Sequence, residues 1–165
     1  MLLVEQLKPR RHDRGGFACG EASLDDYLRQ KAAQHHRDGI STTHVLVDDG
    51  DPTRILGYYS LSAAQLLLTD LQEADRNCLP NYPVPAIRMG RLAVSGTEQG
   101  KGHGDHLLAH AVARSLGLRE QLGVCVLLVA ALNVKAANFY RAYGFREATA
   151  SSHALYLPLG KGGRQ

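Results

Sequence analysis

The chain has 165 residues and a mass of 17.9 kDa, which is enough for one folded domain and too little for two. Its 44% hydrophobic and 21% charged residues exclude a disordered chain. No apolar run reaches the roughly 20 residues of a membrane span, and the charges near the start follow the apolar residues, the reverse of a secretory signal. We therefore expect a single domain over residues 1–165, located in the cytoplasm.

The net charge is only +3, but basic residues gather near the start of the chain. The segment KPRRHDR (8–14), here named the basic arm, carries four Lys or Arg side chains against one Asp. Such a cluster indicates either a surface that faces phosphate groups or a solvated arm without a partner. The sequence leaves both interpretations open.

In the first half of the chain, the patterns predict a helix, a hairpin and an insertion. Ser23 and Asp26 resemble a capping box before apolar residues at helical spacing, and Gly39 ends that helix. THVLV (43–47) and RILGYYSLS (54–62) flank the turn sequence DDGDP, which predicts an antiparallel hairpin. Residues 65–85 form an ordered insertion, whose three prolines in CLPNYPVP exclude both a helix and a central strand.

The second half is more regular. A strand over residues 86–94 leads through the loop SGTEQGKGHG to a helix with an apolar face, formed by Leu107, Leu108, Ala111, Val112 and Leu116. GVCVLLVA (123–130) is typical of a strand buried on both faces. VKAANFYRAY (134–143) predicts a helix that ends at Gly144, and ALYLPL predicts a last strand before a frayed KGGRQ (161–165). This order of elements favours an α/β fold.

The loop between the first of these strands and its helix contains Gly100, Gly102 and Gly104. Backbone N–H groups and a helix N-terminus can converge there on an anion, with phosphate the expected guest. The spacing fits neither the GxGxxG pattern of a dinucleotide fold nor a Walker loop, so neither NAD nor ATP is favoured.

Together with a second motif, this loop resembles the GNAT acetyltransferase family. The family's pyrophosphate loop is matched by Gln99, Gly102 and Gly104. Its following strand and helix are similar to a run formed by Asn133, Ala137, Asn138, Phe139, Tyr140, Gly144 and Phe145. The resemblance implies a mixed, splayed β-sheet with helices on both faces, an α/β (α+β) arrangement, with acetyl-CoA between the two central strands.

The resemblance also implies how acetyl-CoA is held. The loop should bind its pyrophosphate largely by backbone, the edge of the 92–94 strand should pair with the pantetheine amides, and two asparagines should add hydrogen bonds or act as ordinary caps. The expected residues are Leu92, Ala93, Val94, Gln99, Gly100, Lys101, Gly102, His103, Gly104, Asn133 and Asn138.

A narrower resemblance lies outside these motifs. Phe17, Cys19, Gly20, Leu24, Asp25, Tyr27 and Leu28, together with LPNYPVPAIRMGRLAV, are similar to the GNAT toxins of bacterial toxin–antitoxin modules. That resemblance implies acetylation of the α-amino group of aminoacyl-tRNA, a homodimer, and a ribbon-helix-helix antitoxin that carries the toxin onto operator DNA. The alternatives are acetylation of a small-molecule or protein amine, and a non-catalytic role as an antitoxin-bound corepressor component.

For catalysis, the resemblance makes Tyr140 the proton donor to the coenzyme thiolate, with Tyr143 as its rival one turn away. The strand AIRMGRLAV has no carboxylate to serve as a general base. An α-amine with a pKa near 8 needs such a base less than a lysine does, so the missing carboxylate favours an α-amine substrate; the alternative is an acid supplied by another segment of the chain.

Other chemistry-bearing residues are weaker candidates. His103, His106 and His110 lack a second ligand cluster, so we expect no metal. Cys19, Cys78 and Cys125 are widely spaced and odd in number, so we expect free thiols; no base marks Cys19 as a nucleophile, and Cys125 is expected to be buried. Candidate contacts to tRNA are basic: Lys8, Arg10, Arg11, Arg14, Lys31, Arg37, Arg76, Arg88 and Arg91.

Overall fold

The computed structural model describes residues 1–76, Leu79, 83–149 and 151–160. Cys78, the central part of LPNYPVP and the expected frayed segment 161–165 lie outside the described residues. The strands order as β1-β2-β3-β4-β5-β7-β6 in a seven-stranded sheet. The chain divides into two compact units, residues 1–62 with 90–112 and residues 63–89 with 113–165.

In the first unit, three antiparallel strands follow one another in space. β1 (Leu2–Gln6) pairs with β2 (Thr42–Asp48), and β2 pairs with β3 (Gly57–Leu66). The hairpin predicted around DDGDP is therefore confirmed, although β3 begins three residues later than expected and runs on to Leu66. β1 escapes prediction because its five residues owe their strand conformation to pairing with β2 rather than to a local signal.

The first helical segment consists of α1 (Ala22–Asp26), a π-helical turn η1 (Tyr27–Lys31) and α2 (Ala32–Arg37). The predicted capping box is wrong, because the N-cap residue is Glu21, without a side-chain cap. The Asp25 carboxylate instead accepts a hydrogen bond from the Cys19 backbone N–H at 2.9 Å, which ties the preceding loop to the helix. Gly39, with φ 72°, follows the end of α2 as predicted.

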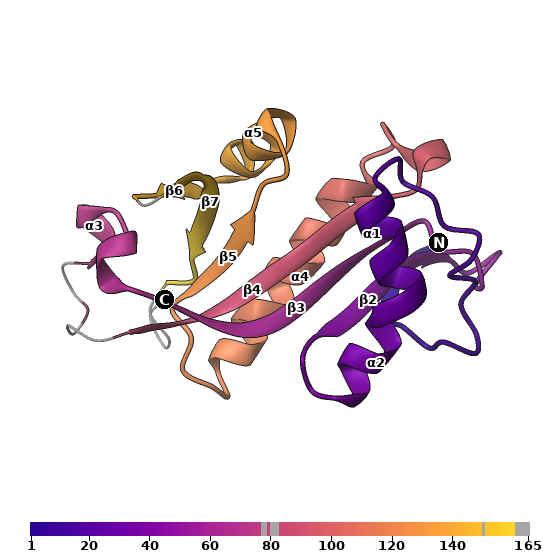
Figure 1. Cartoon of the computed structure of the whole chain (residues 1–165), viewed down its shortest axis with the longest axis horizontal. Coiled ribbons are helices and arrows are strands. Elements are labelled where there is room, and N and C mark those ends of the chain that lie inside the picture. The colour runs from indigo at the N-terminus through magenta and orange to yellow at the C-terminus, as the bar shows by residue number, and fades with distance from the viewer. Residues whose placement is uncertain (77–78, 80–82, 150, 161–165) are drawn as a thin grey trace. The chain divides into compact units, whose positions relative to one another are not determined.

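This segment covers one face of the strands (Figure 1). Leu24, Tyr27 and Leu28 are buried against the β2 and β3 side chains of Val45, Val47 and Tyr58. The helical spacing of those apolar residues predicted this buried stripe correctly.

β4 (Val84–Val94) leads through the short 3-10 turn η3 (Gly96–Glu98) to α4 (His103–Arg119). Two expectations are wrong here. Pro85 lies inside β4, where its second position in the strand is tolerated. Leu116 is 43% exposed, whereas Ser115 is fully buried. In the last turns of α4, the buried face therefore no longer coincides with the predicted apolar face.

The second unit has its own core, in which Leu71, Val84, Val126 and Tyr156 are buried. Its helical elements are η2 (Leu68–Asp70), α3 (Glu73–Arg76) and α5 (Val134–Tyr143), and its strands include β5 (Val126–Ala130), β6 (Arg146–Ala148) and β7 (Ser151–Pro158). β5 lies parallel to β4 over Ala86–Met89 and antiparallel to β7. The predicted burial of β5 on both faces holds except at Leu128, half-buried, and Ala130, exposed. α5 ends at Gly144 (φ 116°), as predicted.

In the described part of the insertion that precedes β4, residues 72–75 make contacts to the C-terminal strands. The Tyr156 hydroxyl donates to the Asp75 carboxylate at 2.5 Å and accepts from the Gln72 backbone N–H at 2.8 Å. The carboxylate of Asp75 also pairs with Arg146. Within the part of the chain that the structure describes, no helix is both long and apolar enough to cross a membrane.

Two glycine-to-alanine substitutions test the packing of the first unit and the helix propensity of α4. A Cβ at Gly57 would lie 2.7 Å from Leu107 Cδ1 and 2.8 Å from the Ala93 carbonyl oxygen, so Gly57→Ala should lower the free energy of unfolding by about 1–3 kcal/mol. Gly117→Ala, at an exposed helical site with open space, should raise it by about 0.5 kcal/mol. Urea unfolding measures both, and equal stability of Gly57→Ala and the parent would contradict the close packing.

Candidate active site

The glycine-rich loop between η3 and α4 has a backbone that ordinary residues avoid. Gly100 and Gly102 have φ of 83° and 82°, in the left-handed region. A Cβ at either position would meet no atom within 4 Å. Glycine is therefore required there for its backbone conformation, while the space beside the loop stays open.

The loop leaves its own donors unused. The backbone N–H groups of Gly100, Lys101 and Gly102 donate no hydrogen bond to any described residue. The first N–H groups of α4 add to them, because the first turn of a helix has no intrahelical acceptors. Free amides at a helix N-terminus, beside open space, form a site for an anion such as a diphosphate.

Gln99 supports this loop through its side chain. Its Nε2 group donates to the carbonyl oxygens of Val94 and Cys19, both at 3.1 Å. The neighbouring Gly96 N–H also donates to the Ala18 carbonyl oxygen, at 2.8 Å. Gln99 thus ties the loop to the end of β4 and to the segment before α1, and its side-chain donors are directed at protein.

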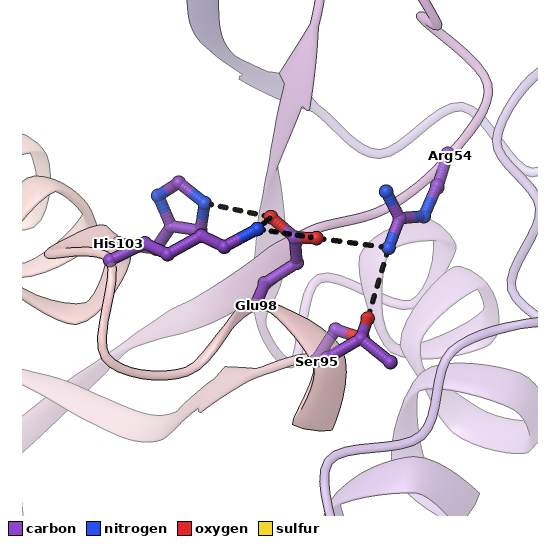
Figure 2. A network of polar contacts seen from close by, with 6 residues as sticks. Arg54, Ser95, Glu98 and His103 are labelled. Atoms are coloured by element: carbon purple, nitrogen blue, oxygen red, sulfur yellow. Dashed lines mark hydrogen bonds and ion pairs between the residues drawn. The ribbon is translucent and has the colours of Figure 1, made fainter.

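A second anchor is the carboxylate of Glu98, shown in Figure 2 between Arg54 and His103. It contacts Arg54 Nη2 at 3.1 Å, Lys101 Nζ at 3.3 Å and His103 Nε2 at 3.2 Å. Its side chain is only 12% exposed. The hydrogen bond from His103, reinforced by those from Lys101 and Arg54, holds the pKa of this carboxyl below its usual range, so it is ionised at neutral pH.

The sequence predictions included Lys101 and His103 but neither Glu98 nor Arg54. Glu98 precedes Lys101 by three residues, so charge pairing along the loop was a usable signal. Arg54 lies 44 residues earlier, in the connection between β2 and β3, and no local pattern links it to the loop.

β4, the strand before the loop, continues beyond the segment that pairs with β5. The pairing of β4 with β5 runs from Ala86 to Met89, and β4 continues to Val94. Leu92, Ala93 and Val94 therefore lie past the paired part, where an extended ligand could hydrogen-bond as an added strand. Their contact with a pantetheine chain stays a prediction.

In the second unit, α5 carries the other predicted residues. Asn133 is the N-cap residue of α5, and its Oδ1 accepts from the Ala136 N–H at 2.8 Å, as the alternative interpretation of a cap predicted. Asn138 Oδ1 accepts from Arg141 Nη1 at 2.8 Å. The side-chain oxygens of both asparagines are thus engaged within the helix, and each retains its NH₂ group as a donor.

Tyr140 lies in a buried aromatic group. Its ring is 5.4 Å from the rings of Phe139 and Phe145, and the residue is 7% exposed. Its hydroxyl makes no hydrogen bond with any other described residue. Burial raises the pKa of Tyr140 to about 12, which keeps the phenol protonated at neutral pH. The rival, Tyr143, is 39% exposed.

The observed bounds of β4, Val84–Val94, include no Asp or Glu. Burial, with a further contribution from Asp25, raises the pKa of the Cys19 thiol to about 11, which argues against a nucleophilic thiolate. Cys125 is half-buried beside the core of the second unit, less covered than predicted. Among the described residues, no three His, Cys, Asp or Glu side chains are arranged to hold a metal ion.

The basic residues predicted to contact tRNA differ in their exposure and in their contacts with the rest of the protein. Lys8, Arg10, Lys31, Arg37 and Arg88 are exposed, and Arg76 is half-buried. Arg11 lies 3.8 Å from the Glu5 carboxylate, and Arg14 Nη1 donates to the Arg29 carbonyl oxygen at 3.3 Å. Arg91 lies 3.5 Å over the ring of Tyr27, so its guanidinium has a packing role.

Comparisons with known proteins agree with the sequence resemblance. The profile described as acetyltransferase (GNAT) domain matches residues 39–147. The chain is 39% identical over 141 residues to the tRNA-acetylating toxin of Mycobacterium tuberculosis, covering 83% of this chain and 82% of the toxin. It is 30% identical to the solved structure of AtaT complexed with acetyl-methionyl-tRNAfMet, with a TM-score of 0.89, covering 96% of this chain and 95% of AtaT.

Further structures of AtaT include its partners. AtaTR bound with acetyl-CoA is 31% identical, with a TM-score of 0.79, over 96% of this chain and 93% of that one. The AtaT–AtaR complex bound to DNA is 30% identical, with a TM-score of 0.75, over 95% of this chain and 94% of that one. AtaR is described as an antitoxin.

Gly102→Ala tests the anion site. The substitution strains a backbone with φ 82°, and should cost about 1–2 kcal/mol of stability and weaken acetyl-CoA binding about tenfold or more as the amides turn away. Gly39→Ala is the matched control, because Gly39 has φ 72° and equally open space but lies outside the loop. Calorimetry should find unchanged affinity in the control; unchanged affinity in folded Gly102→Ala would remove the coenzyme from this loop.

Proposed function

Because this chain belongs to the GNAT acetyltransferase family, we propose that it transfers the acetyl group of acetyl-CoA to the α-amino group of an aminoacyl-tRNA. As a toxin, it would thereby block translation, since an acetylated amine cannot take part in peptide-bond formation. The observation that carries the acetyl-CoA assignment is the loop whose Gly100, Lys101 and Gly102 amides are unengaged beside open space. The similarity to a tRNA-acetylating toxin supports the choice of substrate.

The residues present fit this coenzyme. The free amides of the loop suit a diphosphate, and the stretch of β4 beyond its pairing with β5 suits an extended chain of amides. When bound, acetyl-CoA supplies an activated thioester, from which an amine takes the acetyl group and a thiolate departs. We propose that the ligand contacts come from the two asparagine NH₂ groups, the strand and the loop, namely Leu92, Ala93, Val94, Asn133, Asn138 and Gln99–Gly104.

Tyr140 has the properties of the proton donor to the departing thiolate. Its phenol is protonated at neutral pH and its hydroxyl donates to no other described residue, so its proton is available. Donation neutralises the sulfur as the C–S bond breaks, and the phenol regains a proton from the solvent or from the acetylated amine. The buried surroundings disfavour a lasting phenolate, so the return of the proton is favoured.

The absence of a carboxylate from β4 supports an α-amine as acceptor. A lysine side chain, with a pKa near 10.4, is almost wholly charged at neutral pH and needs a base before it can attack. An α-amine has a pKa near 8, and the neighbouring ester of an aminoacyl-tRNA lowers it further, so a reactive neutral fraction exists without help from the protein.

We propose that tRNA is held through its phosphates by basic side chains that include the basic arm. The candidates are Lys8, Arg10, Arg11, Arg14, Lys31, Arg76, Arg88 and Arg91. Those with exposed guanidinium or ammonium groups, such as Lys8 and Arg10, are the best placed to exchange counterions for phosphate. Contacts of this kind position a nucleic acid without reading its sequence.

The partners proposed follow the toxin relatives. We propose a ribbon-helix-helix antitoxin, operator DNA reached through it, and a homodimer; the DNA-bound AtaT–AtaR complex supports an antitoxin partner and DNA binding through it. The cytoplasm, where charged tRNA and acetyl-CoA occur together, is the proposed location. We propose one acetyltransferase domain over residues 1–165, since the GNAT match at 39–147 draws on residues of both units.

Tyr140→Phe should keep acetyl-CoA affinity and lose about 10²-fold in kcat, because only the donated proton is removed. In the parent enzyme, activity should rise with pH as the substrate amine loses its proton, with no fall up to about pH 10 since the pKa of Tyr140 is about 12. Tyr143→Phe, at an exposed position, should change kcat less than about threefold. Steady-state kinetics over pH 6–10 measures the pH profile of the parent and kcat of the two variants. A larger loss of kcat in Tyr143→Phe than in Tyr140→Phe would exchange the roles of the two tyrosines.

The substrate is tested by incubating the protein with radiolabelled acetyl-CoA and a pool of charged tRNA. Label should enter the aminoacyl ends, and cell-free translation should stop in the presence of acetyl-CoA. Uncharged tRNA is the control and should stay unlabelled. Unimpaired translation with active acetylation of small or protein amines would select the alternative acetyltransferase, and CoA binding without any acetylation would select the corepressor role.

A further inference from the structure

The coenzyme loop cannot be held in shape by hydrogen bonds from its own amides. If the N–H groups of Gly100, Lys101 and Gly102 are to bind a diphosphate, they cannot also donate to carbonyl oxygens within the loop. In the structure they donate to no described residue. Glycines at two of these three positions make the backbone more costly to order. Side chains must therefore hold the loop before the ligand arrives.

Glu98 has the geometry for that task. Its carboxylate gathers donors from three separate segments: Arg54 from the β2–β3 connection, Lys101 from the loop and His103 from the first turn of α4. The contacts span the loop, because Glu98 lies before it and His103 after it. Figure 2 shows the carboxylate between the imidazole and guanidinium groups.

The contact to His103 is the most protected of the three. The His103 and Glu98 side chains are 9% and 12% exposed, whereas Lys101 and Arg54 are 57% and 48% exposed. An exposed ion pair contributes little, but a buried imidazole that loses its only partner pays a desolvation penalty. His103 Nδ1 has no partner among the described residues, so Glu98 is the sole hydrogen-bond acceptor for this ring.

We infer that Glu98 is a positioning residue of the coenzyme loop, which keeps the loop amides directed at the diphosphate by holding His103 and Lys101. The inference rests on the proposed binding of acetyl-CoA by this loop. A carboxylate beside an anion site would by itself repel the ligand. Here two cations within 3.4 Å balance its charge, and salt screens what remains.

The two effects of Glu98 predict opposite results, so one substitution separates them. In Glu98→Ala the loop is released and must be ordered again on binding, which should weaken CoA binding about tenfold. Simple repulsion predicts tighter binding, most of all at low salt. Glu98→Gln retains an oxygen that accepts from His103, and should restore affinity to within about threefold of the parent.

Calorimetric titration of CoA into the parent, Glu98→Ala, Glu98→Gln and Asp26→Ala, at low and moderate salt, measures these affinities. Asp26→Ala removes a carboxylate from an exposed α1 ion pair with Arg29, away from the loop, and should leave affinity unchanged. Tighter or unchanged binding by Glu98→Ala, or no restoration by Glu98→Gln, would overturn the inference. Failure of the parent itself to bind CoA would instead refute the proposed function.

Kinetics with two thioesters separate positioning from a general structural role. With acetyl-CoA, Glu98→Ala should raise KM about tenfold and change kcat less than twofold. With acetyl-pantetheine, which lacks the diphosphate, kcat/KM should stay within about twofold of the parent. An equal loss with both thioesters, or a fall in kcat alone, would mean that Glu98 supports folding or chemistry rather than the loop.

Discussion

A loop that binds an anion through its amides cannot use those amides to stabilise itself, and the rest of the site follows from this constraint. Gly100 and Gly102 allow the backbone to direct its N–H groups outward, at the cost of conformational freedom. The stabilising contacts then come from side chains on either side of the loop, Gln99 to backbone carbonyls and Glu98 to cationic groups. The loop is ordered by its neighbours and remains open to a ligand.

The proposed catalytic chemistry divides in a similar way between protein and substrate. In this proposal the protein contributes a buried, protonated phenol, Tyr140, whose pKa burial raises further, and it contributes no carboxylate from β4. A thiolate leaving group needs a proton, whereas an α-amine near its pKa needs little help to become neutral. An enzyme with a donor and no base on this strand is therefore suited to an acceptor that is already partly deprotonated.

The positive charge of the chain is partly committed to its own structure. The Glu5 carboxylate lies beside Arg11 and accepts a hydrogen bond from the buried His12. The Arg91 guanidinium lies over the ring of Tyr27. Since Arg14 also donates to the Arg29 carbonyl oxygen, the basic arm offers fewer uncommitted charges than its sequence contains. Lys8 and Arg10, which are exposed, retain their full freedom to meet phosphate, and binding through such groups depends strongly on salt.

Local patterns in the sequence determined the hairpin around DDGDP, the glycine loop before α4, and α5 with its final Gly144, because periodicity and glycine conformation act over a few residues. The family resemblance, rather than a local pattern, led to the prediction that Tyr140 and Gln99 belong to the site. Tertiary structure alone decided that β1 and β6 are strands, that Pro85 lies inside β4, and that Arg54 meets Glu98 across 44 residues. Those features depend on partners distant in the chain, and a short segment or a single charge carries no local record of the neighbour that folding brings to it.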